Sequence, residues 1–197
     1  MVCRVETVEG VVHHYAAKGI ILLDEADYLE VRKQGGYLGV SSSTKHTVLR
    51  AFALFYPTQE GKRIPKSEPV GREWLHRFIL KAPPRLVVDH INNNPLDNRR
   101  CNIRLCTQSE NKQNSQVART SKTGFKGVTV CGDSFKASIT LRGKNRILGY
   151  FPGADLAAKV YDLAAVDFFG EFAKTNFDRE AIEAWRPEWE KIKGLFG

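Results

Sequence analysis

The chain has 197 residues, of which 42% are hydrophobic, and its formal net charge is +8. This hydrophobic content is typical of globular proteins and argues against a wholly disordered chain. The sequence contains no apolar run of the roughly 18 residues that a membrane-spanning helix needs and does not open on a basic-then-apolar signal, so we expect a cytoplasmic protein with no membrane partner.

The positive charge is concentrated in the middle of the chain. Residues 81–130 carry nine Lys and Arg residues against three Asp and Glu residues, whereas residues 131–178 carry six of each. A localised basic block is typical of a surface that binds a polyanion, although an ordinary solvated basic face is still open at this point. Four cysteines without CxxC spacing are predicted to be buried free thiols rather than zinc ligands: Cys3, Cys101, Cys106 and Cys131.

The first third of the chain is predicted to be β-rich. Its apolar and β-branched runs are separated by Gly19, Asp24 and the Gly35-Gly36 pair. A loop or hinge is predicted over residues 57–71, which contain three prolines and two glycines. The predicted strands cover residues 8–15, 20–23, 37–40, 48–56 and 74–80.

The central stretch predicts the order strand, loop, strand, helix. Val87 and Val88 lead as a strand into Asp89 and His90, and residues 103–106 form a second short strand after a turn-rich loop. A helix is predicted to start after Thr107, because Thr107 and Glu110 have the spacing of a capping box.

The C-terminal part predicts a small sheet followed by helices. Three strand-like runs at residues 125–131, 135–141 and 147–151 are joined by residues suited to hairpin turns. A helix is predicted over residues 154–169 and ends at Gly170. A last amphipathic segment over residues 179–196, interrupted at Pro187, is predicted to pack on a domain. The whole chain is therefore predicted to have an α+β fold.

The residues of the central stretch suggest a metal-assisted hydrolysis. Asp89 supplies a carboxylate and Asn111, one turn into the predicted helix, supplies an amide oxygen. Such oxygen ligands suit a magnesium ion that keeps most of its waters and binds phosphate oxygens. His90, next to that ion, could take a proton from an attacking water.

The string VVDHINNNPLDNRRCNIRLCTQSENKQN, residues 87–114, resembles the HNH motif of phage and intron homing endonucleases with a ββα-metal fold. The resemblance implies that Asp89 and Asn111 bind one Mg²⁺ or Mn²⁺ ion and that His90 is the general base. It also implies that Asn102 braces the loop and orients the imidazole of His90.

Several basic residues in and before this stretch are candidates for phosphate contacts. His76 and Arg77 resemble the His-Arg pair often found upstream of the motif, and they either touch phosphate or pack against the hairpin. The basic residues predicted to hold the DNA backbone independently of its sequence are Arg99, Arg100, Arg104 and Lys112.

Residues 121–177 resemble the Apetala-two/ethylene-response-factor DNA-binding domain. The resemblance rests on GFKGV at 124–128, FKASI at 135–139, LGYF at 148–151 and the alanine-rich run 157–165. It implies a three-stranded sheet that enters the major groove, with the aspartates of the helix facing away and with Tyr161 and the alanines in the core. Strand one lacks the arginines and strand two the tryptophan of plant members, so the plant target sequence does not transfer. The predicted DNA contacts are Lys126, Lys136, Arg142, Lys144 and Arg146.

Four parts are predicted: an N-terminal β-rich region (1–71), an HNH nuclease unit (72–118), an Apetala-two-like DNA-binding domain (121–178) and a helical tail (179–197). The function predicted first is a homing-type DNA endonuclease that nicks double-stranded DNA as a monomer rather than a homodimer, in a bacterial or phage-infected cell. The alternative is a non-catalytic DNA-binding regulator that retains the HNH fold. An RNA-binding protein is less favoured, because the aromatic residues form no recognisable stacking platform.

Overall fold

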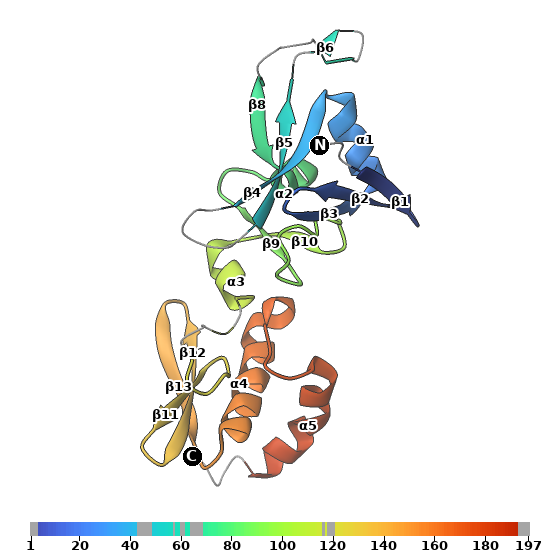
Figure 1. Cartoon of the computed structure of the whole chain (residues 1–197). Coiled ribbons are helices and arrows are strands. Elements are labelled where there is room, and N and C mark those ends of the chain that lie inside the picture. Colours follow the sequence, from blue (N-terminus) through green and yellow to red (C-terminus); the bar gives the residue numbers. More distant parts are fainter. Residues whose placement is uncertain are drawn as a thin grey trace. The chain divides into compact units, whose positions relative to one another are not determined.

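The chain forms two compact units, Met1–Gln108 and Ser109–Gly197. Figure 1 shows their elements in a computed structural model. Both units combine helices with small antiparallel sheets, so the predicted α+β fold class is confirmed. Among the described residues, no helix is long and apolar enough to cross a membrane. The structure describes residues 4–42, 49–56, 58–59, 62–63, 69–115, 117 and 121–192.

Two three-stranded sheets form the frame of the first unit. In one sheet β2 lies between β1 and β3, and the other sheet has the order β4-β5-β8. Strands β9 and β10 form a separate antiparallel hairpin, and β6 pairs with β7. The elements are β1 (Arg4–Val8), β2 (Val11–Ala16), β3 (Gly19–Asp24), α1 (Glu25–Lys33), β4 (Gly36–Ser42), β5 (Leu49–Phe55), β6 (Thr58–Gln59), β7 (Lys62–Arg63), β8 (Gly71–Trp74), α2 (Leu75–Leu80), β9 (Val87–His90) and β10 (Ile103–Cys106).

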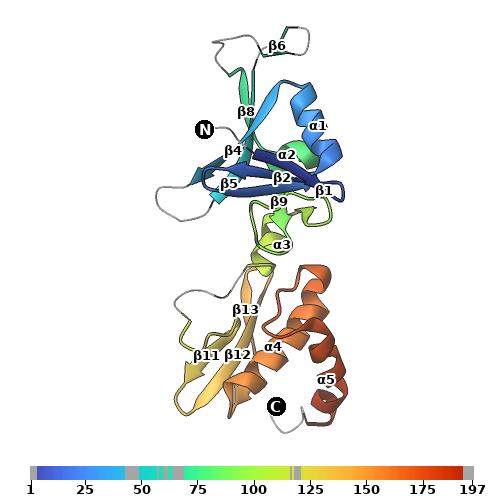
Figure 2. The same ribbon diagram turned by 45° about the vertical axis from the view of Figure 1, so that its right-hand side comes forward.

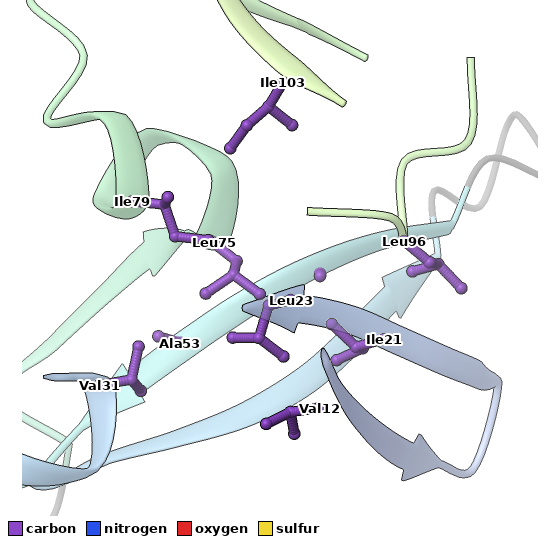
Figure 3. Close-up of a cluster of buried hydrophobic side chains, with 10 residues drawn as sticks. Val12, Ile21, Leu23, Val31, Ala53, Leu75, Ile79, Leu96 and Ile103 are labelled. Atoms are coloured by element: carbon purple, nitrogen blue, oxygen red, sulfur yellow. The ribbon is translucent and has the colours of Figure 1, made fainter. Parts of the chain in front are cut away.

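One hydrophobic core joins these pieces. Figure 3 shows Val12 and Leu23 from the first sheet, Ala53 from β5, Leu75 from α2 and Ile103 from the hairpin among its buried side chains. Burying one large aliphatic side chain contributes about 1.5–3 kcal/mol. The hairpin therefore depends on the same apolar contacts as the N-terminal strands, although the sequence analysis treated the two as separate parts.

Two segments of the first unit differ from the sequence prediction. Residues 74–80 were predicted as a strand but form the end of β8 and helix α2. Leu75 and Ile79 are spaced four apart, so both side chains fall on one helix face, where they are buried. Helix α1 was not predicted at all, although acidic residues occupy its first turn and basic residues its last turn, which is the order that the helix dipole favours.

The remaining strand predictions for the first unit agree with the structure with one subdivision. The predicted strands at 20–23, 37–40 and 48–56 correspond to β3, β4 and β5. The run 8–15 contains a turn between β1 and β2, where Glu9 has a φ of 50° and Gly10 a φ of 76°. This turn lets the two strands pair with each other.

The second unit is a three-stranded antiparallel sheet with helices on one side. The sheet has the order β11-β12-β13, and α4 contacts all three strands. Figure 2 shows α4 and α5 on the same side of this sheet. The helix predicted over residues 154–169 is confirmed, and so are the three strands, although β11 begins at Val128 rather than at residue 125 and β13 begins at Lys144 rather than at residue 147. The elements are α3 (Gln108–Gln113), which begins at the unit boundary, β11 (Val128–Cys131), β12 (Ser134–Leu141), β13 (Lys144–Phe151), α4 (Ala154–Phe169), a 3-10 turn η1 (Gly170–Phe172) and α5 (Arg179–Ile192).

Small residues let α4 lie close to the sheet. Ala157, Ala158 and Ala165 are completely buried, and Tyr161 is 5% exposed. The Tyr161 ring lies so close to Gly127 that a Cβ atom there would be 1.9 Å from Cδ2 of the ring. The prediction that Tyr161 and the alanines belong to the core is confirmed.

Asp162, one of the helix aspartates expected to face away from DNA, has a structural role inside the second unit. Asp162 is completely buried. Its carboxylate accepts hydrogen bonds from the main-chain N–H groups of Asn176, at 2.8 Å, and Phe177, at 2.9 Å, and from Nδ2 of Asn176, at 2.9 Å. Burial raises the pKa of Asp162, and these donors oppose the rise. Asp162 thus fastens the chain that follows η1 to the middle of α4.

Helix α5 continues through Pro187, so the predicted interruption is wrong. Trp185 and Trp189, four residues apart and on either side of the proline, both pack against the core and hold the two halves in one line. The Trp189 ring is 6.1 Å from that of Phe151. The predicted packing of this tail is confirmed for α5, whereas Phe196 lies outside the described residues.

The cysteines are only partly as predicted. Cys106 is a buried free thiol, but Cys101 and Cys131 are exposed. Cys101 lies in the polar loop before β10, and Cys131 ends the edge strand β11, where no apolar layer covers it. Cys3 and parts of the predicted hinge (57–71) and linker (118–123) lie outside the described residues.

Candidate active site

The β9–β10 hairpin places an acid and a histidine next to each other at the end of a strand. The antiparallel register pairs His90 with Ile103 and Asp89 with Arg104. Both strands have the positions predicted from the sequence, and α3 begins where the capping box predicted it. Ile103 is buried in the core, so the apolar side of the hairpin fixes the strand that carries both candidate catalytic residues.

Asp89 is held by the arginine directly opposite it. Nε and Nη2 of Arg104 both donate to Oδ2 of Asp89, at 3.0 and 2.9 Å. The Arg104 side chain is 13% exposed and the Asp89 side chain is 4% exposed. Removing one partner of such a buried pair costs about 3–5 kcal/mol, because it leaves an uncompensated charge. Arg104, predicted to contact phosphate, thus has a structural partner inside the hairpin.

His90 is a half-buried imidazole whose surroundings keep it neutral at neutral pH. Burial lowers its pKa, whereas the Asn98 side chain and the charges of Asp89 and Asp97 raise it, and the charge of Arg50 lowers it. A neutral imidazole can accept a proton, as a general base must. Asn98 is a site residue that the sequence analysis did not single out, although it lies within the motif string.

His76 packs against His90. The two rings are 5.2 Å apart between centroids and meet edge to face, at 81°. Burial, followed by the charges of His90, Arg77 and Arg50, lowers the pKa of His76 to about 4. His76 thus supports the imidazole of His90 as an uncharged ring, and its predicted phosphate contact stays a prediction.

Arg77, the other member of the upstream pair, holds the connection between α2 and β9. Nη1 of Arg77 donates to the carbonyl oxygen of Leu86 at 2.9 Å, and Nη2 donates to those of Ala82, at 2.8 Å, and Pro83, at 3.1 Å. Of the two roles that the sequence allowed for Arg77, phosphate contact or packing against the hairpin, these contacts correspond to packing. They fix the chain that leads into the catalytic strand.

Asn102 stabilises the loop between the two strands. Its Oδ1 accepts from the main-chain N–H of Asn92 at 3.0 Å, and its Nδ2 donates to Oδ1 of Asn92, at 3.0 Å, and to the carbonyl oxygen of Asp97, at 2.8 Å. The loop is also tied to β3, because Leu22 donates its N–H to the carbonyl oxygen of Leu96 and accepts from the N–H of Asn98. The loop that carries the candidate residues is therefore anchored at both sides.

Two more predicted phosphate contacts are engaged inside the protein. Arg99 makes two hydrogen bonds to Asp97, at 2.8 and 2.7 Å, and this pairing lowers the pKa of Asp97 against the effect of its burial. Arg100 makes two to Asp27 of α1, at 2.9 and 2.7 Å. Arg99 thus makes an ion pair within the loop, whereas Arg100 ties the loop to α1. The contact of both arginines with DNA stays a prediction.

The oxygen chemistry of Asp89 fits a hard divalent cation. Among the described residues, no group of three or more His, Cys, Asp or Glu side chains could hold a metal by itself. Magnesium keeps several of its waters and binds through one or two carboxylates, so a single buried aspartate suffices as the main protein ligand. Asn111 and Lys112 are exposed residues of α3 in the second unit, and the prediction that Asn111 shares the ion with Asp89 rests on the sequence alone.

The basic residues of the second unit that were predicted to contact DNA differ in whether their side chains are engaged within the unit or exposed. Nζ of Lys126 donates to the main-chain carbonyls of Gln113 and Ser115, and burial, followed by the charge of Lys174, lowers its pKa to about 8. Lys126 therefore serves the fold. Lys136 alternates along β12 with the buried Ala137 and so lies on the face of the sheet away from α4.

The remaining cations gather at the tip of the β12–β13 hairpin. Arg142, Lys144 and Arg146 are exposed and line a hollow of about 590 Å³ together with Phe168 and Phe169. Their side chains reach solvent without an internal ion pair among the described residues. The sequence predicted all five basic residues of this unit as DNA contacts. In the structure, Lys126 is hydrogen-bonded within the unit, whereas these three residues are accessible to solvent.

The β9–β10 hairpin presents Asp89 and His90 beside a loop that Asn102 braces, which is the arrangement expected of an HNH-type unit. Residues 74–113 match the family model described as HNH endonuclease, which confirms this part of the sequence interpretation.

The chain is also 35% identical over 118 residues to an uncharacterized HNH endonuclease of Acanthamoeba polyphaga mimivirus. That match covers 57% of this chain and 62% of the relative, so the chain spans less than two thirds of the relative's length. No solved structure matches the chain. The likeness of the second unit to the Apetala-two domain rests on its sequence motifs.

Proposed function

We propose that the protein is a site-directed DNA endonuclease that hydrolyses a phosphodiester with one divalent metal ion, and that it nicks DNA as homing-type enzymes do. The observation that carries this proposal is the neutral, half-buried His90 next to the buried carboxylate of Asp89 at the end of β9. The match of residues 74–113 to the HNH endonuclease model supports it.

The residues of the hairpin divide the reaction between them. His90 accepts a proton from water while the water oxygen forms a bond to phosphorus and the bond from phosphorus to the leaving oxygen breaks. Asp89, with Asn111 as the expected second ligand, holds the metal. The bound ion supplies positive charge that offsets the charge growing on the phosphate and its leaving oxygen. His76, packed edge to face against the ring, keeps the imidazole of His90 in place.

The second unit is proposed to keep the enzyme on double-stranded DNA. Its three-stranded sheet has one face covered by α4 and presents Lys136 on the other, and a β-sheet of this size can enter the major groove. Its sequence resemblance to the Apetala-two domain supports the same role. A monomer with a single HNH site cuts one strand, so nicked product is expected.

A second function is favoured by one specific observation. The carboxylate of Asp89 is engaged by Arg104, and a carboxylate neutralised by a cation is a weaker metal ligand. If that pair persists in the presence of metal, the HNH fold serves DNA binding alone, and the protein is a non-catalytic DNA-binding regulator.

The first test is cleavage of supercoiled plasmid with Mg²⁺, with Mn²⁺ and with EDTA. We expect metal-dependent conversion to open circle, reduced at least about 100-fold in His90→Ala because a general base contributes at least this much. His13→Ala on β2 is the matched control and retains activity. Linear product would show that both strands are cut. An intact plasmid under conditions where the protein binds DNA would favour the regulator.

A further inference from the structure

One face of the β4-β5-β8 sheet lies opposite the hydrophobic core. On β5, Ala51 and Ala53 are buried in the core, and alternation along a strand therefore places Arg50 and Phe52 on the opposite face. The antiparallel register adds Trp74 of β8 opposite Phe52. We call this surface the arginine–aromatic face; it consists of Tyr37, Gly39, Arg50, Phe52, Arg72 and Trp74.

The aromatic side chains of this face hold its two arginines in position. The Arg72 guanidinium lies 4.1 Å from the ring centroid of Phe52 and 5.2 Å from that of Trp74, and the guanidinium of Arg50 lies 5.7 Å from the Trp74 ring. Gly39 makes room for this stack, because a Cβ atom there would lie 2.6 Å from Cζ of Phe52. Stacking on aromatic rings restricts an arginine while leaving its N–H donors available.

The arginines of this face have no acidic partner among the described residues. None of the residues that β4, β5 and β8 contribute to it is acidic. Within the described part of the chain, neither Arg50 nor Arg72 forms an ion pair. The contrast with Arg99, Arg100 and Arg104 is direct, because each of those is paired with an aspartate.

The arginine–aromatic face adjoins the candidate active site. Trp74 is followed immediately by α2, which carries His76, and His76 packs on His90. The charge of Arg50 lowers the pKa of both imidazoles, so Arg50 lies within electrostatic reach of the candidate general base.

We propose that the arginine–aromatic face binds the phosphate backbone of double-stranded DNA and holds it beside His90. Guanidinium groups bind phosphate oxygens through two N–H donors, and pre-oriented arginines lose little freedom when they do so. The face deepens the proposed nuclease function by assigning backbone binding in the first unit to residues outside the HNH motif. Such contacts are independent of base sequence.

The test measures binding of the full-length protein to a fluorescent duplex in EDTA, over a series of salt concentrations. Each lost phosphate contact reduces the slope of log K against log salt by about 0.9. We expect that reduction in Arg50→Gln and in Arg72→Gln, with affinity falling roughly tenfold for each, since a hydrogen bond to a charged group contributes about 1.5–3 kcal/mol. Lys33→Gln, on α1 at the core side of the same sheet, is the matched control and leaves the slope unchanged.

Further variants separate charge from folding. Arg50→Lys retains the charge, so its salt slope stays close to that of the wild type, and the melting temperatures of all variants identify any that fail to fold. We expect the same reductions in affinity and salt slope on duplexes of unrelated sequence, because contacts with the backbone are independent of base sequence. A double Arg50→Gln, Arg72→Gln variant that melts normally and binds with the wild-type slope and affinity overturns the proposal, as does a preference for single strands that depends on Trp74 alone.

The outcome is distinguishable from that of the nuclease test. The wild type could bind DNA without cutting it while the arginine variants show the expected reduction in salt slope. This result would support DNA binding by the arginine–aromatic face and contradict the catalytic function. The wild type could instead cut DNA while the double variant binds DNA as the wild type does. This result would support the nuclease function and contradict DNA binding by the arginine–aromatic face.

Discussion

The loop of the β9–β10 hairpin and the core of the second unit are both well packed, but different forces hold them. The loop buries Asp97, Asn98 and Asn102 and is organised by hydrogen bonds and ion pairs, whereas α4 meets its sheet through alanines and the Tyr161 ring. Hydrogen bonds fix the direction of a side chain, while apolar contact fixes mainly its distance. The part of the molecule that carries the chemistry is thus the part built from directional contacts.

The largest effect is expected where close packing in the second unit is disturbed. Gly127→Ala should destabilise the unit by about 3 kcal/mol, because the new methyl group meets the Tyr161 ring and because Gly127 has a φ of 76°. Gly132→Ala is the control, since Gly132 has a φ of 58° and open space around its Cα, and it should cost about 1 kcal/mol. Urea unfolding measures both, and equal losses would contradict the packing account.

A smaller loss is expected when the polar network of the loop is broken. Asn102→Ala leaves the N–H of Asn92 and the carbonyl of Asp97 without their partner and should cost about 2 kcal/mol. Hydrogen exchange should accelerate in residues 91–102, and plasmid cleavage should fall with it. Asn145→Ala, at an exposed position of β13, should change stability by less than about 0.5 kcal/mol. Unchanged exchange in the loop of Asn102→Ala would show that other contacts hold it.

The smallest effect concerns a buried polar group that lies outside any network. Both ring nitrogens of His14 lack a hydrogen-bond partner among the described residues, and burial, followed by the charge of Arg32, lowers the pKa of His14 from its ordinary value of 6.5. The unfolded chain therefore binds the proton more readily, so stability should fall as the pH drops below 6.5.

His14→Leu tests this pH dependence against the wild type. The variant removes one group that must be protonated in the unfolded state, so its free energy of unfolding should fall less between neutral pH and about pH 5. Denaturant unfolding at the two pH values gives the difference, and the subtraction cancels the other histidines. A variant that loses as much stability as the wild type would show that the pKa of His14 is the same in the folded and the unfolded chain.

The elements that could be predicted are those determined by local pattern. The helix over residues 154–169 has an apolar stripe, alanines and a terminal glycine, and α4 has the same bounds. Strand β10 also agrees to the residue. Residues 74–80 were ambiguous, because a run of seven residues with few polar positions fits a strand as well as a short helix. Only the burial of Leu75 and Ile79 against the core decides between the two.

The sequence predicted which residues form the candidate site, but not which distant residues they pair with. The motif string placed Asp89, His90 and Asn102 in one hairpin. The partner of Arg100 is Asp27, 73 residues away, and no local pattern indicates that pairing. Arg50 was missed for a similar reason, because its closeness to His90 depends on how β5 and α2 pack. Long-range pairing therefore decided which arginines are available to bind DNA.

The tie between the loop and β3 has a consequence for the order of folding. Leu22 accepts a hydrogen bond from Asn98, which lies 76 positions later in the chain, and such a contact forms only after the entropy of closing that long segment has been overcome. During synthesis the N-terminal strands emerge first, so the loop arrives at a strand that already exists. We expect the general base to reach its final orientation among the last events of folding, when the first unit closes on itself.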